Sequence, residues 1–234
     1  LNVSGGTLAS TNTGATANQV GAGALTLGSA ILNYNKSDAT TAVQTYTGTT
    51  LTGNTNSRLA LNTSGSANLT VNLGTSTTAS QITRGTQSTI NFVLGSATAN
   101  VNVGAATTLG NWATVTTPSG TNFATKNGSN QVIAVTPTAN DNPSTWTNAN
   151  ITDSAGFSGT YNATTGISSL RFNAAAASTA AINSAAFLNI SGGGVLVTSN
   201  VGANAASITG GFLSSTGNEL MVHQLNTGAD FTIS

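Results

Sequence analysis

The rarest side chains of this 234-residue chain gather in one short segment, NELMVHQ at positions 218–224. The segment holds the chain's only glutamate, only methionine and only histidine, which are Glu219, Met221 and His223. A carboxylate and an imidazole perform general acid–base catalysis when both lie within hydrogen-bonding distance of one reacting group. The i, i+4 spacing of Glu219 and His223 joins their side chains on a helix but separates them on a strand. The local secondary structure therefore decides whether this segment is a site.

The segment that follows Glu219 has the apolar period of a strand. Leu220 and Val222 alternate with the rare side chains, and such alternation is typical of a half-buried strand. On a strand the backbones of Glu219 and His223 lie about 13 Å apart, which is too far for direct proton exchange. We predict that Leu220 and Val222 face inward. Met221 and His223 then face outward, where they are candidate contacts for assembly with a neighbouring subunit.

The other carboxylates are Asp38, Asp141, Asp153 and Asp230. An enzyme that hydrolyses glycosides needs two carboxylates about 5–10 Å apart. Asp141 and Asp153 share one irregular region, and Glu219 precedes Asp230 by 11 residues, close to one step between strands. A polysaccharide-degrading enzyme on a β-helix therefore stays open as a minor alternative. The prediction that we carry forward is that the protein is not an enzyme and has no catalytic residues.

Metal and cofactor sites lack the residues that they need. The chain has no cysteine and one histidine, which cannot build a zinc site alone. The segment NDN at 140–142 supplies one carboxylate, whereas calcium needs six to eight oxygen ligands. Neither Lys36 nor Lys126 lies in a phosphate-binding loop of the G-x-x-x-x-G-K-S/T type. We therefore expect no metal and no cofactor.

The composition limits the partners and the setting of the protein. Only 4% of residues are charged, and the net charge is zero. Binding to nucleic acid needs a concentrated basic surface, so no nucleic-acid partner is expected. No apolar run approaches the roughly 20 residues that span a bilayer, so no membrane insertion is expected. Arg58, Arg84 and Arg171 are expected to face solvent. A neutral surface rich in Asn, Thr and Ser indicates an extracellular or cell-surface protein.

Apolar residues alternate with polar ones along most of the chain, and clusters of Gly, Asn, Ser and Thr separate the short strands that this pattern predicts. Both a β-sandwich and a β-solenoid are built in this way. Few aromatics (5%) and many polar residues that can stack at corners favour the solenoid. We predict one all-β, right-handed parallel β-helix over residues 1–234, with about ten coils of roughly 20–25 residues. The β-sandwich is the alternative.

One region, at about residues 112–150, breaks this pattern. It contains both tryptophans of the chain and all three of its prolines, and proline removes a hydrogen-bond donor from a strand ladder. We predict an irregular excursion from the coils here. Two interpretations of the tryptophans stay open. They cover the side of the core, or Trp112 and Trp146 form a contact surface for a glycan or a protein partner.

Several phrases of the chain resemble the autotransporter-associated β-strand repeat family of large bacterial surface proteins. The phrases are LNVSGGTLAS (1–10), GALTLGSAILNYN (23–35), SSLRFNAAAA (168–177), LNISGGGVLVTSNVG (188–202), ITGGFL (208–213) and ELMVHQLNTGADFTIS (219–234). The resemblance implies a right-handed parallel β-helix that is exported and displayed on a bacterial surface as a stalk, adhesin or fibre. The family has no shared catalytic residues, and no complete repeat is present in this chain.

The function that these observations predict is structural: a segment of an exported bacterial surface rod, fibre or filament. Both ends of the chain look like sequence from the middle of a solenoid, and open strand edges invite pairing. We therefore expect that the chain is either part of a longer protein or stacks end to end with copies of itself. The alternatives are an adhesin that binds glycan or protein and, further off, a phage fibre.

Overall fold

A computed structural model describes residues 1–15, 17–76, 78–163, 166–216 and 219–234. The regular structure is nearly all β, with 3% helix, and forms a β-solenoid of about nine turns of stacked parallel coils. The predicted all-β parallel β-helix is confirmed, and the β-sandwich alternative is wrong. The chain divides into two compact units, Leu1–Ala134 and Val135–Ser234, whose boundary lies inside the predicted excursion. Each unit is described by itself.

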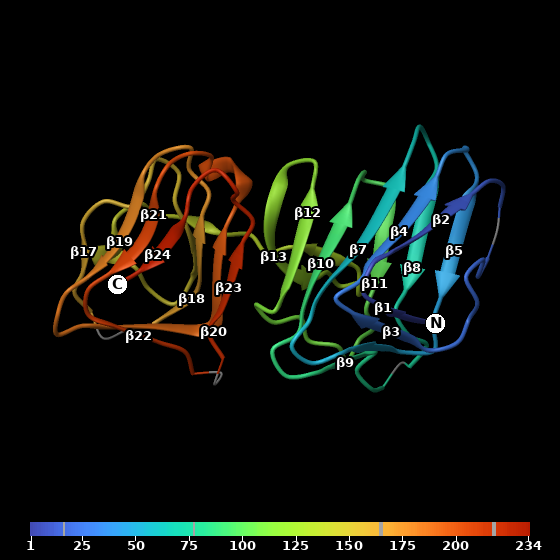
Figure 1. Cartoon of the computed structure of the whole chain (residues 1–234), viewed down its shortest axis with the longest axis horizontal. Helices are drawn as coiled ribbons and strands as arrows, with labels where there is room; N and C mark the ends of the chain where they lie inside the picture. The colour runs from blue at the N-terminus through green and yellow to red at the C-terminus, as the bar shows by residue number, and fades with distance from the viewer. Residues whose placement is uncertain (16, 77, 164–165, 217–218) are drawn as a thin grey trace. The chain divides into compact units, whose positions relative to one another are not determined.

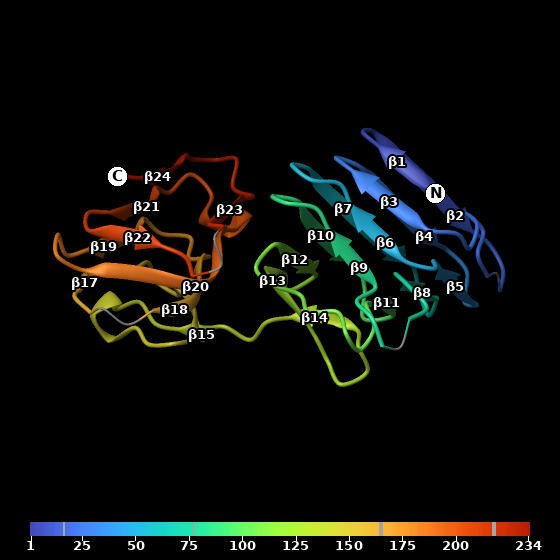
Figure 2. The same ribbon diagram turned by 90° about the horizontal axis from the view of Figure 1, so that it is seen from below.

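Unit 1 is a stack of coils with three faces, and each complete coil gives one strand to each face (Figures 1 and 2). The first face contains β1 (Asn2–Ser4), β3 (Leu25–Gly28), β6 (Thr49–Leu51) and β9 (Ile82–Arg84). The second contains β2 (Thr7–Asn12), β4 (Ile31–Lys36), β7 (Asn56–Thr63), β10 (Thr89–Leu94) and β12 (Ala113–Thr117). The third contains β5 (Thr41–Thr45), β8 (Asn68–Asn72) and β11 (Ala99–Asn102). Neighbouring strands within each of these groups run parallel.

The core of unit 1 consists of apolar rows that run from coil to coil. Leu32, Leu59, Phe92 and Val115 are register partners on four successive strands, and all four are fully buried. Successive side chains of a strand point to opposite faces, so the alternating sequence delivers one apolar residue per coil to the same row. Burial of each such side chain stabilises the fold by about 1.5–3 kcal/mol.

The last part of unit 1 reverses direction and covers the end of its stack. Strand β13 (Gly120–Lys126) pairs antiparallel with β12, and β14 (Val132–Ala134) pairs antiparallel with β13. Ala124 and Val132 are buried in the core, and Gln131 forms a bridge with Asn102 of β11. These strands therefore join the second face to the third across the end of the coils. We call residues 120–134 the cap of unit 1.

Unit 2 has two main sheets of parallel strands (Figure 1). One contains β15 (Thr138–Ala139), β16 (Asn150–Thr152), β18 (Ile167–Phe172) and β20 (Phe187–Val197), and both β22 (Phe212–Ser214) and β23 (Met221–Gln224) pair with β20. The other contains β17 (Thr160–Tyr161), β19 (Ser178–Ile182), β21 (Ala206–Thr209) and β24 (Phe231–Ile233). Two short 3-10 turns, Pro143–Thr145 and Ser199–Val201, complete the unit.

Candidate functional site

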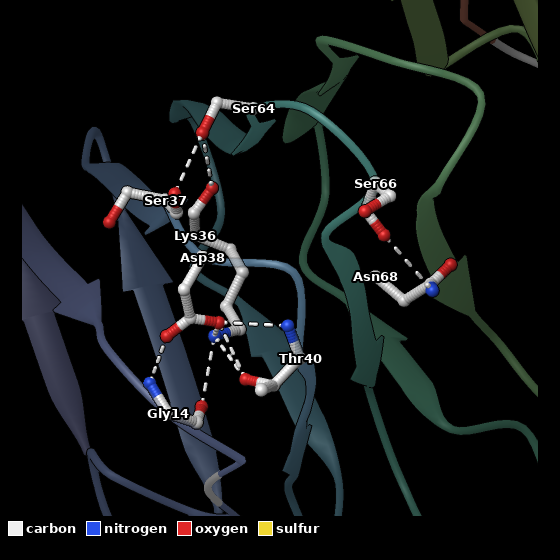
Figure 3. A network of polar contacts seen from close by, with 8 residues as sticks. All are labelled: Gly14, Lys36, Ser37, Asp38, Thr40, Ser64, Ser66 and Asn68. Atoms are coloured by element: carbon white, nitrogen blue, oxygen red, sulfur yellow. Dashed lines mark hydrogen bonds and ion pairs between the residues drawn. The ribbon is translucent and has the colours of Figure 1, made fainter.

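Asp38 lies in a polar network at a corner of unit 1 (Figure 3). Its carboxylate pairs with the Lys36 ammonium, whose side chain is fully buried, and it accepts hydrogen bonds from the backbone N–H groups of Gly14 and Thr40. Lys36 Nζ also donates to the Gly14 carbonyl at 2.9 Å and to Thr40 Oγ1 at 2.8 Å. The hydrogen bond from Lys36, followed by those from Thr40 and Gly14, holds the pKa of Asp38 well below its usual range. The network links the coil that contains Gly14 to the next coil, which contains Lys36 and Asp38.

Asp141 and Asp153 each accept hydrogen bonds from backbone N–H groups. Asp141 accepts hydrogen bonds from Ser154 N at 2.6 Å, from Ser154 Oγ at 2.7 Å and from Ala155 N. Burial raises the pKa of Asp141, but these hydrogen bonds together outweigh it and lower the pKa. Asp153 is buried, and its Oδ1 accepts from the N–H groups of Asn173 and Ala174.

Arg171 is buried beside Asp153, so the expectation that it faces solvent is wrong. Its Nη2 donates to Asn173 Oδ1 at 2.7 Å, and Asn173 also accepts a hydrogen bond from Thr198 Oγ1. Burial lowers the pKa of Arg171, although the Asp153 charge opposes this effect. Asp153 and Arg171 belong to neighbouring coils, because Thr152, which precedes Asp153, is the register partner of Arg171.

Glu219 and Asp230 do not form the stacked pair that their spacing suggested. Glu219 precedes β23 and Asp230 precedes β24, and these strands belong to different sheets of unit 2. The strand stacked on β24 is β21, and the strand stacked on β23 is β20. The 11-residue separation is therefore a step around one coil and not from one coil to the next. Among the described residues, no group of three or more His, Cys, Asp or Glu side chains gathers as metal ligands would.

Within the segment NELMVHQ, Met221–Gln224 form β23, Glu219 and Leu220 precede that strand, and Asn218 lies outside the described residues. Val222 is the register partner of the buried Val195, so it continues an apolar row of the core. Val222 thus lies on the predicted inward row, but Leu220 and Val222 are 38% and 42% exposed and neither is buried in the described structure. The physical reason is that β23 pairs with β20 on one side, and no strand among the described residues pairs with its other side. Met221 and His223 are both half-buried, and their predicted role in assembly stays a prediction.

The three strands β22, β23 and β24 form what we call the end coil of unit 2. Phe212, Val222 and Ile233, one from each strand, are 53%, 42% and 48% exposed. Val222 and Ile233 are register partners of Val195 and Ile208, which are buried. The apolar rows of the core therefore reach this coil, but no described strand covers them there.

Two exposed phenylalanines on the side of unit 2 were missed by the sequence analysis. The rings of Phe187 and Phe212 stack with their centroids 4.5 Å apart and their planes at 12°. They are register partners on β20 and β22, and both are about half exposed. The signal in the sequence is a repeated Phe-Leu dipeptide, at 187–188 and 212–213.

The two tryptophans occupy different surroundings. Trp146 is 2% exposed, its Nε1 donates to the Asn140 carbonyl at 3.0 Å, and its ring packs edge-on against Phe157 at 4.9 Å. Its ring is therefore not accessible to a glycan or a protein, and the first interpretation, core cover, applies to it. Trp112 is half-buried, and the guanidinium of Arg84 lies 5.7 Å from its ring centroid, a cation–π contact. A glycan contact at Trp112 stays a prediction.

No protein-family model matches this chain, and comparison with curated proteins and with solved structures found no match. Within the described ranges, no helix has the length and the apolar character that crossing a membrane requires. The end coil of unit 2 exposes Val222 and Ile233 in line with buried core rows, and it is our candidate functional site.

Proposed function

We propose that this chain is a structural segment of an exported bacterial surface rod or fibre and that the end coil of unit 2 is where a further β-coil stacks. The observation that carries the proposal is the exposure of Val222 and Ile233, whose register partners Val195 and Ile208 in the preceding coil are buried. A covering coil would remove these side chains from water, which stabilises by about 25 cal/mol for each Å² of apolar surface. The open backbone edges of β22, β23 and β24 would gain ladder hydrogen bonds at the same time.

Uncharged side chains form many of the contacts between coils, which supports a stacked structural segment. Amide and hydroxyl groups of neighbouring coils bond to each other, as Asn72 and Asn102 do at 2.7 Å and Thr179 and Ser207 do at 3.0 Å. Such contacts are insensitive to salt, whereas surface ion pairs are screened by it. Each coil meets its neighbours only, so stability grows with the number of coils. These properties suit an extended protein outside the cell, and the family resemblance suggests the bacterial surface.

The covering coil could come from a second copy of the chain or from a longer form of the same chain, and two experiments separate these sources. Sedimentation velocity at rising protein concentration detects copies that stack. We expect Val222→Lys to abolish any such assembly, because the charge would be buried in the joint. Ile133→Lys, at a position that is 40% exposed on the cap of unit 1, is the matched control and should assemble normally. Assembly of Val222→Lys to the wild-type extent would overturn stacking at the end coil.

The second experiment extends the chain. A duplicate of residues 187–211, which span one coil from the start of β20 to the residue before β22, is appended after Ser234. If the end coil accepts a further coil, the extended chain should gain strand content and a higher free energy of unfolding, measured by circular dichroism and urea titration. An appended coil that stays unfolded, in a chain that also remains monomeric, contradicts the proposed function.

A further inference from the structure

Unit 1 contains a hollow of about 440 Å³ between the corner after β10, the turn that joins β12 to β13, and β14. All the residues that line it belong to unit 1. Small-molecule sites in proteins typically measure about 300–1,000 Å³, so the hollow has the size of a ligand pocket. The cap creates it. Gln131, which immediately precedes β14, forms a bridge with Asn102 of β11. The lining residues Asn100 of β11 and Ile133 of β14 each lie two positions from that bridge.

The walls of this hollow are mainly apolar and carry no ionisable side chain. Ala99, Pro118, Val132 and Ile133 contribute apolar surface. Ile133 is 40% exposed, so its side chain is available for contact. An apolar wall favours a ligand with an apolar body, and the lack of a counter-charge disfavours a charged one.

The polar lining consists of the hydroxyl groups of Ser96, Thr117 and Ser119 and of two amide side chains, which offer both donors and acceptors. Asn100 is half-buried, and its side-chain amide makes no hydrogen bond to the residues that the structure describes. Gln131 Oε1 accepts a hydrogen bond from Asn127 at 3.0 Å, which leaves the Gln131 Nε2 group as a donor. A small number of polar groups in an apolar pocket fixes the orientation of a ligand. An amide or a hydroxyl group on the ligand matches the donors and acceptors of these side chains.

We propose that this hollow in unit 1 binds a small uncharged molecule that has an apolar body and one amide or hydroxyl group, which Asn100 and Gln131 hold. The rod would then carry a ligand site on its cap, separate from the end coil.

The test uses benzamide as the probe, with benzoate and benzylammonium as charged molecules of similar shape. Proton–nitrogen correlation spectra follow the side-chain amide signals of Asn100 and Gln131 during each titration. We expect saturable shifts with benzamide and at least tenfold weaker binding of the two ions. Asn100→Ala should weaken benzamide binding by about two- to tenfold, the range for one lost hydrogen bond.

A filling substitution separates this hollow from other surfaces. Ala97 is an exposed residue of the lining, so Ala97→Phe should occupy the hollow and abolish the benzamide shifts. Ala79→Phe places the same ring on an exposed position of unit 1 outside the lining and should bind benzamide normally. Thermal unfolding of both variants checks their folding. The proposal is overturned by an absence of saturable shifts in the wild-type protein, by equal binding of the ions, or by full binding in a folded Ala97→Phe variant.

Discussion

A valine at the capped end of unit 1 is buried, whereas a valine at the end coil of unit 2 is exposed. Val132 lies on the cap of unit 1 and is 3% exposed, whereas Val222 lies on the end coil of unit 2 and is 42% exposed. Both valines belong to strands that extend an apolar core. The difference is that β14 follows two reversals of direction, while β23 keeps the parallel direction of the coils. The core of unit 1 is therefore covered at the end where the chain reverses direction and adds the antiparallel strands β13 and β14.

The turn that starts the cap shows why the reversal occurs at this place. Antiparallel strands can be joined by a two-residue loop, whereas parallel strands need a long crossover. Thr117 pairs with Gly120, so Pro118 and Ser119 form such a loop. Gly120 has φ of 113°, a conformation that glycine adopts without the strain that a side chain would cause. The proline that breaks the coil pattern in the sequence is thus a turn residue of the cap.

The largest effect should come from placing a charge at each of the two ends. We expect Val132→Asp to lower the free energy of unfolding of unit 1 by about 4 kcal/mol, because an unpaired carboxylate would be buried. The matched change Val222→Asp should cost unit 2 less than about 1 kcal/mol in the monomeric chain. Urea unfolding, followed by Trp112 fluorescence for unit 1 and Trp146 fluorescence for unit 2, measures both values. Equal losses at the two sites would contradict the difference between the ends.

A smaller effect should separate the interior of unit 2 from its end coil. Asp153→Ala removes the acceptor of two backbone N–H groups and the charge beside the buried Arg171. We expect a loss of about 2–4 kcal/mol in the free energy of unfolding of unit 2. Asp230→Ala changes an exposed acid next to β24 and should cost less than about 0.5 kcal/mol. A cost at Asp230 as large as that at Asp153 would show that the end coil is a fixed part of the core.

The smallest effect should appear in the pH dependence of stability, with one carboxylate in each unit. The pKa values of Asp38 and Asp141 are both lowered by folding, so each contributes stability above the unfolded-state pKa of about 3.9. That contribution is lost as the pH falls through the folded-state value. We expect Asp38→Asn to flatten the acid limb of unit 1, and Asp141→Asn to flatten that of unit 2. The check is urea unfolding between about pH 5 and pH 2, and an unchanged slope in either variant contradicts the assignment for that unit.

The strands and the solenoid could be predicted from the sequence, because alternation of apolar and polar residues is a local property. Leu25 and Leu27, or Val195 and Val197, are buried on strands as their spacing predicts. The resemblance to bacterial surface proteins predicts an extracellular location, which stays a prediction. The site predictions fared worse. Trp146 was a candidate surface residue, but it is buried because its ring packs near Phe157 and Tyr161, which lie 11 and 15 residues further along the chain.

The sequence by itself therefore determined that this chain stacks short strands around apolar rows and that charge plays little part in its surface. Only the tertiary structure decided where a stack closes, which row stays open and where a hollow forms. Those features depend on which segments pair across coils, as Gln131 pairs with Asn102. The local alternation of apolar and polar residues does not specify such long-range pairs. The exposure of Val222 has the same cause. On a solenoid, a core residue becomes buried when the next coil packs over it, so its own strand does not determine its burial.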